Sequence, residues 1–280
     1  NCRRAINYYN SNPERAEEVV LKLIRQKRNN KKTYEQSYTT KQKAGMLELY
    51  LKNNNINNFI SIFLSSEDEY KYLSGVSKYD TLDQLESIAN LANNNQSTTL
   101  LVRMHPNMHS MPIKARNDYY NLGLKYQNVH IIGPRNKIST YEVLDMSDMV
   151  IVFCSTMGVE SSYVGKKTIG IGPNPYLDLN IFPVYRNSDD LKLDNFSPPI
   201  PDKKSSIIWL NYLYKYSDKN RYLSWNGNKI LYKNRNFNRG FFGYLLAIPS
   251  RIHLELILGK LLIAVNDKIK QIFGLINNNE

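Results

Sequence analysis

Five short, mostly apolar runs recur between residues 59 and 171, and longer segments with helical spacing separate them. The runs do not alternate apolar with polar residues, which is typical of strands buried on both faces of a parallel sheet. We therefore predict strands at these runs, which are Phe59–Leu64, Thr99–Met104, Val129–Ile132, Met149–Phe153 and Thr168–Ile171.

The segments between these runs have the features of helices. Thr81–Ala92 carries apolar residues at helical spacing, and Ile113–Tyr126 and Met157–Val164 continue the series. Ser139 and Glu142 stand at the spacing of a capping box, so a short helix is expected after Ser139. Strands that alternate with helices predict an α/β protein with a doubly wound, Rossmann-like parallel sheet and flanking helices.

The two ends of the chain lack this regular alternation. Pro13–Arg28 is predicted to be an amphipathic helix, because it opens with proline and acidic residues and closes on basic ones. Lys41–Leu51 could form a second helix. The expected organisation is an N-terminal helix and basic linker over residues 1–57, a Rossmann-like domain over 58–180, and a C-terminal segment over 181–280 that packs back on that domain.

Residues 181–280 divide into three parts. Ser205–Tyr216 is predicted to be a helix, and residues 218–240 are polar and expected to be loop-like. Pro249–Phe273 has apolar residues at helical spacing, interrupted by charged ones. Two interpretations of this last helix stay open: it packs on its own domain, or it docks on a membrane surface, because lysines flank its apolar face.

The charge balance favours anionic partners. Thirty-seven basic and twenty-five acidic residues give a net charge of +12, which suits phosphorylated small molecules, acidic lipid or nucleic acid. A nucleic-acid partner is not expected, since we find no helix-turn-helix and no interleaved aromatic and basic residues. Two cysteines exclude a disulfide framework and fit a reducing compartment.

Polar or small residues follow every predicted strand. In a doubly wound sheet, ligands bind at the carboxyl ends of the strands, so we expect these clusters to meet at one edge and form a ligand site. The clusters are Ser65–Glu69, Arg103–Pro106, Gly133–Pro134, Cys154–Gly158 and Gly172–Tyr176.

The segment Ser155–Gly158 precedes a predicted helix. Backbone amides at that helix start, together with the hydroxyls of Ser155 and Thr156, suit a phosphate or diphosphate. Glu160, one turn further, could accept hydrogen bonds from ribose hydroxyls. An ordinary helix cap is the alternative interpretation. Glycine-rich phosphate fingerprints are absent, which argues against a dinucleotide oxidoreductase and a Walker-type ATPase.

Arg103 and His105 end the second predicted strand, and Pro106 fixes the turn so that the imidazole faces the edge. Both cations could neutralise phosphate, and a protonated His105 could assist a departing phosphate. A purely structural His105 is the alternative. His109 lies four residues on, but Pro106 disfavours a shared helical face, so no metal is expected.

The acidic residues Glu67, Asp68 and Glu69 follow the first predicted strand. One of these carboxylates could act as a general base or orient a sugar, and a solvated helix start is the alternative. Cys154 is expected to be a small buried residue, because the sequence offers no identifiable base to activate it as a nucleophile.

Three segments resemble bacterial capsule and surface-polysaccharide biosynthesis proteins, and their order is similar to the nucleotide-binding half of GT-B glycosyltransferases. These segments are Ile60–Tyr70, Leu101–Asn107 and Ile138–Tyr176. The resemblance implies that residues 58–180 form a GT-B C-terminal domain that binds a nucleotide-sugar. Related sialyl- and Kdo-transferases hold the phosphate of a CMP-sugar with His-Pro and Ser-Ser/Thr motifs, which correspond here to His105-Pro106 and Ser155-Thr156.

The resemblance also implies individual roles at the site. Glu160 would face the nucleoside, and a carboxylate among Glu67–Glu69 would act in catalysis or acceptor binding. The implied catalytic candidates are His105, Glu67, Asp68 and Glu69. The implied donor-binding set is Ser65, Ser66, Arg103, His105, Pro106, Ser155, Thr156, Met157, Gly158, Glu160 and Tyr176.

The implied function is the donor-binding half of a glycosyltransferase that extends a capsule or lipopolysaccharide glycan on a glycan or glycolipid acceptor. It would use a nucleotide-sugar and no cofactor, in the cytoplasm or at the inner face of the membrane. The alternatives are a glycerophosphate transferase, a sugar-nucleotide epimerase, or a non-catalytic nucleotide-binding component of a polysaccharide assembly complex. Residues 1–57 are too short for the N-terminal acceptor domain of GT-B enzymes, and the chain begins without Met, so we expect a fragment.

Overall fold

The computed structural model of the chain divides into two compact units, residues 1–218 and 219–280. The structure describes residues 2–31, 39, 41–66, 80–94, 98–192 and 198–217 of the first unit, and residues 223–226, 229–232 and 235–236 of the second.

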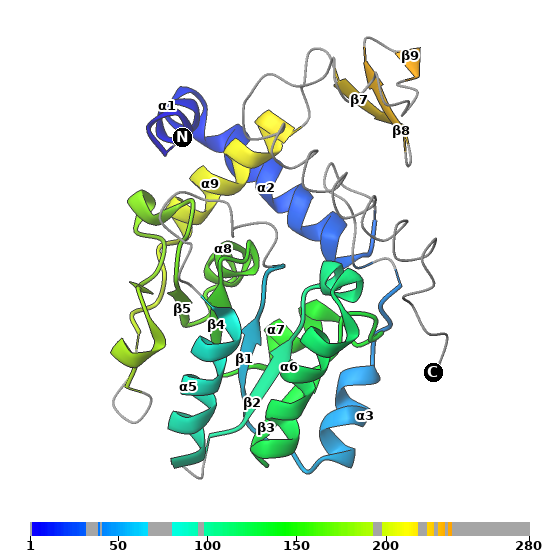
Figure 1. Ribbon diagram of the computed structural model, residues 1–280. Helices are drawn as coiled ribbons and strands as arrows, with labels where there is room; N and C mark the ends of the chain where they lie inside the picture. Colours follow the sequence, from blue (N-terminus) through cyan, green and yellow to red (C-terminus); the bar gives the residue numbers. More distant parts are fainter. Residues whose placement is uncertain are drawn as a thin grey trace, which may run out of the picture. The chain divides into compact units, whose positions relative to one another are not determined.

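A six-stranded parallel sheet forms the centre of the first unit (Figure 1). Its strand order is β3-β2-β1-β4-β5-β6, and every neighbouring pair is parallel. The Rossmann-like fold expected from the sequence is therefore confirmed. The strands are β1 (Ile60–Phe63), β2 (Leu100–Arg103), β3 (Val129–Ile132), β4 (Met149–Phe153), β5 (Thr168–Ile171) and β6 (Val184–Tyr185).

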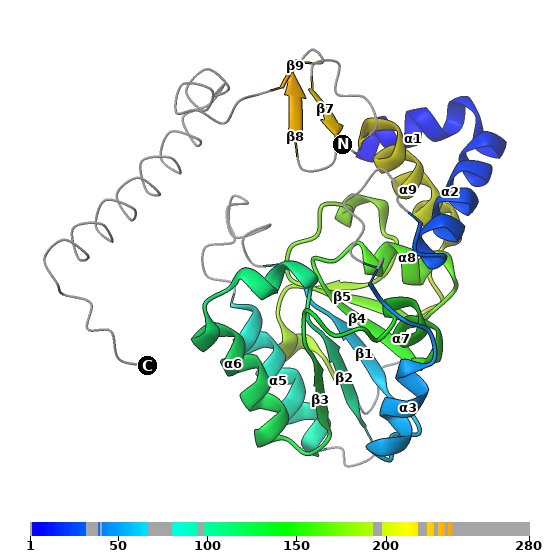
Figure 2. The same ribbon diagram turned by 90° about the vertical axis from the view of Figure 1, so that its right-hand side faces the viewer.

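Helices cover both faces of this sheet, because successive strand residues point to opposite faces and both sets are apolar. Ile62, Ile151 and Phe153 pack on one face against α5 and α6, whereas Phe63 and Val152 pack on the other against α3, α7 and α8. Figure 2 shows this three-layer arrangement. The helices are α3 (Met46–Asn53), α5 (Thr81–Asn94), α6 (Ile113–Lys125), α7 (Thr140–Met146) and α8 (Met157–Tyr163).

Three further helices belong to the same unit: α1 (Cys2–Ser11), α2 (Pro13–Arg28) and α9 (Lys203–Ser217). The predicted helix over 13–28 is confirmed at both ends, and Asn12 caps it by accepting a hydrogen bond from the Arg15 amide at 3.1 Å. Buried residues of all three helices join the core on the α8 side of the sheet. The boundary predicted at residue 57 therefore falls inside one compact unit.

The capping box predicted at Ser139 forms only in part. The Ser139 hydroxyl accepts a hydrogen bond from the Glu142 amide at 3.3 Å. The Glu142 carboxylate, in contrast, accepts from the amide of Gly45 at 2.7 Å. The Glu142 side chain, which would complete the capping box, therefore links α7 to the residue before α3.

The second unit contains strands where a loop was expected. β7 (Leu223–Asn226) and β8 (Lys229–Tyr232) are antiparallel, and β9 (Arg235–Asn236) pairs with β8. The prediction of a loop-like segment is therefore wrong for these residues. The available signal was Gly227-Asn228, a dipeptide typical of two-residue hairpin connections.

The last prediction for the C-terminal segment concerns residues 249–273. The predicted helix Pro249–Phe273, with its two interpretations, lies outside the described residues. Among the helices that the structure does describe, none is both long and apolar enough to cross a membrane.

Candidate functional site

The strand order reverses between β1 and β4. From β1 the chain proceeds outward to β2 and β3, and from β4 it proceeds in the opposite direction to β5 and β6. In open α/β sheets, ligands bind at the carboxyl ends of the strands where the order reverses, since the departing loops leave a crevice there. We therefore take the carboxyl edge of β1, β2 and β4 as the candidate site.

The strand register brings three predicted clusters to the same level of this edge. Phe63 pairs with Arg103 on one side and with Val152 on the other. Ser65, His105 and Cys154 each stand two residues beyond these paired positions, just past the ends of β1, β2 and β4. β2 and β4 flank β1 and therefore lie about 10 Å apart.

A hydrogen bond joins the loops on the two sides of the crevice. The Ser65 hydroxyl donates to the carbonyl of Cys154 at 2.9 Å, and Ser65 and Ser66 are both buried. The Ser65 hydroxyl therefore binds the loop after β4, and little of its surface is exposed to a ligand.

Cys154 is a residue whose role the sequence did not indicate. It has a φ of +51°, in the left-handed region that residues other than glycine rarely adopt. A strained backbone of this kind costs about 1–3 kcal/mol and is often found at functional sites. The side chain is partly exposed rather than buried as expected. Because the residue is not a glycine, nothing in the sequence signals this conformation.

The two hydroxyls that follow Cys154 have different surroundings. Ser155 is buried, and its Oγ accepts from the Met157 amide at 3.4 Å. Thr156 is exposed, and its side chain makes no capping hydrogen bond to α8. Thr156 is thus the hydroxyl of the pair that is available to a ligand.

Met157 and Gly158, also predicted for donor binding, contribute to the packing of α8. Met157 packs against the core as a partly buried side chain. A Cβ atom added to Gly158 would lie 2.6 Å from the Phe182 ring and 2.7 Å from Val152 Cγ2. Glycine is therefore required here by the close contact between helix and sheet, and no phosphate is needed to explain it.

Glu160 is buried between helices, where a ribose contact was expected. Its Oε1 accepts from Lys27 Nζ at 2.8 Å and its Oε2 from the Tyr141 hydroxyl at 2.7 Å. The Glu160 side chain is only 3% exposed. Both oxygens are therefore engaged in joining α8 to α2 and α7.

Tyr176 stabilises the loop after β4, which carries Ser155 and Thr156. Its hydroxyl donates to the Ser155 carbonyl at 2.9 Å, and its ring packs edge-on against Phe182 and Trp209. Burial raises the pKa of this phenol well above its ordinary value, so the hydroxyl stays protonated and remains a donor. Tyr176, predicted to contact the donor, thus stabilises the loop after β4 through this hydrogen bond.

Arg103 is buried beneath the carboxyl edge. Its Nη1 donates to the Gly133 carbonyl at 3.2 Å and its Nη2 to the Asn136 carbonyl at 3.1 Å. Within the described ranges its Nε has no hydrogen-bond partner. Burial lowers the pKa of Arg103 to about 10, so the guanidinium is still charged at neutral pH.

His105 and Pro106 begin the 3₁₀ helix η1 (Pro106–Ser110). The Nδ1 of His105 accepts from the Asn107 amide at 3.3 Å, which orients the ring, and the residue is partly exposed at the edge. His109 lies on the same short helix, with Nδ1 2.7 Å from the Pro106 carbonyl oxygen. Across the part of the chain that the structure describes, no three His, Cys, Asp or Glu residues gather as a metal site would require.

The acidic residues Glu67, Asp68 and Glu69 lie outside the described residues. Their roles as base or acceptor ligand stay predictions. The last described residue before them is Ser66, which is buried.

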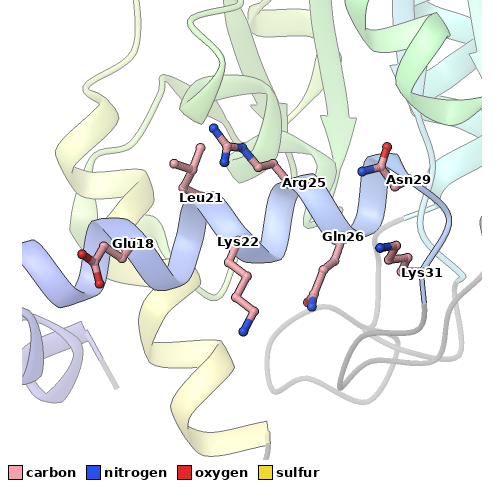
Figure 3. A pocket seen from close by; sticks show the side chains of 7 residues that line it. All are labelled: Glu18, Leu21, Lys22, Arg25, Gln26, Asn29 and Lys31. Atoms are coloured by element: carbon pink, nitrogen blue, oxygen red, sulfur yellow. The ribbon is translucent and has the colours of Figure 1, made fainter.

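A shallow hollow of about 410 Å³ runs along α2, away from the residues predicted for the site (Figure 3). Lys22 and Gln26 point to one side of the helix and Leu21 and Arg25 to the other (Figure 3). It is lined by Glu18, Leu21, Lys22, Arg25, Gln26, Asn29 and Lys31.

No protein-family model matches this chain, and no curated protein is similar to it in sequence. Among solved structures, it is similar to a protein described as a UDP-N-acetylglucosamine 2-epimerase from Listeria monocytogenes, with 15% identity over 66% of this chain and a TM-score of 0.40. It is also similar to S. aureus MnaA in complex with UDP (11% identity, 59% of this chain, TM-score 0.37). A third similar structure is that of the wall teichoic acid polymerase TagF, with 15% identity over 63% of this chain and a TM-score of 0.32.

The chain spans only about half of the length of these three proteins, with 52%, 48% and 44% of each covered. The Rossmann-like fold follows from the sheet topology itself and does not depend on these similarities.

Proposed function

We propose that this chain binds the phosphate-bearing part of a nucleotide-sugar at the carboxyl edge of β1, β2 and β4, as the donor-binding half of a glycosyltransferase. The observation that carries the proposal is the Ser65–Cys154 hydrogen bond, which joins the two loops at the point where the strand order reverses. The His105-Pro106 and Ser155-Thr156 motifs, which resemble those of nucleotide-sugar enzymes, stand on either side of that bond.

The charge distribution at this edge suits a leaving nucleotide phosphate. In glycosyl transfer, the acceptor hydroxyl forms a bond to the anomeric carbon while the bond from that carbon to the phosphate oxygen breaks. Negative charge therefore develops on the phosphate. Preorganised donors and cations at that position lower the barrier, since they need no rearrangement during the reaction.

Each described residue of the site has a defined part in this proposal. Thr156 and the imidazole of His105 would bind the phosphate, and the buried charge of Arg103 would favour the anion from below. Ser65, Ser155 and Tyr176 would position the loops. The carboxylates of Glu67–Glu69 are proposed to take the proton of the acceptor hydroxyl.

Thermal unfolding in the presence of nucleotides tests the binding step. UDP, CDP and CMP are titrated against the full chain, since a ligand that binds only the folded state raises the melting temperature. Thr156→Val and His105→Ala should remove most of the increase. His109→Ala, an exposed histidine on the same 3₁₀ helix, is the matched control and should retain it. Equal protection in all variants would reject the assigned site.

The reaction class is tested by following the nucleotide released from a panel of nucleotide-sugars. A transferase releases free nucleotide only when an acceptor is added, whereas an epimerase converts the sugar and a scaffold protein does neither. Capsule or lipopolysaccharide glycans and a membrane-associated acceptor belong to the same proposal, and they are tested by adding glycan and glycolipid fractions to this assay.

A further inference from the structure

The turn after β3 carries two cations at the same edge of the sheet as the proposed site. It consists of Gly133, Pro134, Arg135, Asn136 and Lys137, and it follows β3, which pairs with β2. Arg135 and Lys137 are exposed, and within the described residues neither side chain has a hydrogen bond or ion pair. The sequence contained a signal for this feature, because two of the three residues that follow the Gly-Pro at the strand end are basic.

The backbone of this turn is held from several directions. The Asn136 amide donates to the Gly133 carbonyl at 3.1 Å, and the Ile138 amide donates to Asn136 Oδ1 at 2.9 Å. The Lys43 amide donates to the Lys137 carbonyl at 2.8 Å. The two cations are thus presented by a backbone that is already ordered, which lowers the entropy lost on binding.

Arg103 also holds the turn, since its guanidinium donates to the carbonyls of Gly133 and Asn136. It is 3% exposed, and no described carboxylate pairs with it. A buried cation without a counter-charge is costly. An anion bound next to the turn would supply that counter-charge.

We propose that the turn Gly133–Lys137 is an anion-binding element that takes the distal phosphate of a nucleoside diphosphate, with Arg135 and Lys137 as the contacts and Arg103 as the positioning residue. The inference rests on the proposed function, because it uses the phosphate site at Thr156 and His105 as its neighbour. It names the ligand class more narrowly: a nucleoside diphosphate is favoured over a nucleoside monophosphate.

Isothermal titration of the full chain with UDP, UMP and inorganic pyrophosphate tests the contacts. Arg135→Gln and Lys137→Gln should each weaken UDP binding by about tenfold, the value of one charge-assisted hydrogen bond, and should leave UMP binding nearly unchanged. Lys52→Gln, an equal loss of charge at the end of α3 before β1 begins, is the control and should change neither.

A double-substitution cycle tests the positioning role of Arg103. Arg103→Lys keeps the charge but loses the two-pronged contact, so amide exchange at Asn136 and Ile138 should become faster. In that background, Arg135→Gln should weaken UDP binding by clearly less than tenfold, because the turn no longer holds Arg135 in place. Fully additive effects would overturn the positioning role.

The outcomes separate this inference from the proposed function. If UDP binds and depends on His105 but not on Arg135 or Lys137, the anion-binding turn is rejected and the proposed function stands. If pyrophosphate binds through Arg135 and no nucleotide binds, the turn is supported as an anion-binding element, and both its assignment to a nucleoside diphosphate and the nucleotide-sugar function are rejected. If the chain binds none of UDP, UMP and pyrophosphate, the anion-binding turn and the proposed function are both overturned.

Discussion

Lys27 of α2 and Glu160 of α8 form an ion pair with an Nζ–Oε1 distance of 2.8 Å, and their side chains are only 12% and 3% exposed. The other Glu160 oxygen accepts from Tyr141 of α7. Next to this pair, Arg28 contacts both carboxylate oxygens of Asp145 at 2.6 and 2.9 Å. The end of α2 is therefore fastened to the sheet-covering helices by two adjacent ionic contacts.

Replacing Lys27 with Met should destabilise the first unit by about 3 kcal/mol, because it leaves the Glu160 carboxylate buried without its cation. The double variant Lys27→Met/Glu160→Gln should recover much of this loss. Urea denaturation measures both. Lys22→Met, an exposed lysine of the same helix, is the control and should change stability by less than about 0.5 kcal/mol. A single Lys27 variant as stable as the control would contradict the importance of the pair.

Gly158→Ala should destabilise the protein by about 1–3 kcal/mol, because the added methyl group would overlap the Phe182 ring and the Val152 side chain. Combining it with Phe182→Leu should cost less than the sum of the two separate losses, since the smaller side chain makes room. The midpoint of urea unfolding of the four proteins in this cycle measures the effect. Strict additivity would show that Phe182 is not the obstacle.

Cys154→Gly should leave stability unchanged or raise it by about 1 kcal/mol, because glycine adopts the left-handed conformation without the steric cost of a Cβ atom. Cys154→Val should lower the melting temperature, since a β-branched residue is least compatible with this backbone. Calorimetric melting of the three proteins makes the comparison. A glycine variant that is less stable than the valine variant would show that the thiol contacts outweigh the backbone strain.

His130 should make the fold less stable in mild acid. Burial lowers the pKa of this half-buried imidazole below its ordinary value of 6.5, and Tyr50 packs edge-on against the ring. As pH falls below 6.5, the unfolded chain takes up a proton that the folded state resists, so stability decreases. Urea unfolding from pH 7.5 to 5 should show this loss in the unsubstituted protein and in His109→Gln, and a smaller loss in His130→Gln. Parallel curves for all three proteins would reject the assignment.

At the candidate site, the sequence predicted which residues follow the strands, but it did not predict which long-range contacts their side chains make. The sequence placed His105 and Ser155 after parallel strands, and the topology brings both to one edge. It also proposed Glu160 and Tyr176 as ligand contacts because of their positions in the chain. The structure instead engages Glu160 with Lys27, which is 133 residues away in the sequence, and Tyr176 with the Ser155 carbonyl. Nothing in the local sequence distinguishes a carboxylate that faces a ligand from one that a distant lysine neutralises.

The sequence by itself determined the parallel sheet of β1 to β5, the helices between these strands, and the ends of α2. These features follow from residue spacing and local capping, which depend on near neighbours in the chain. Only the tertiary structure decided the strand order, the two-residue strand β6, the left-handed backbone of Cys154 and the turn fixed by Arg103. The reason is physical: these features arise from packing and from hydrogen bonds between residues far apart in the sequence, and each forms only when the whole layer is assembled.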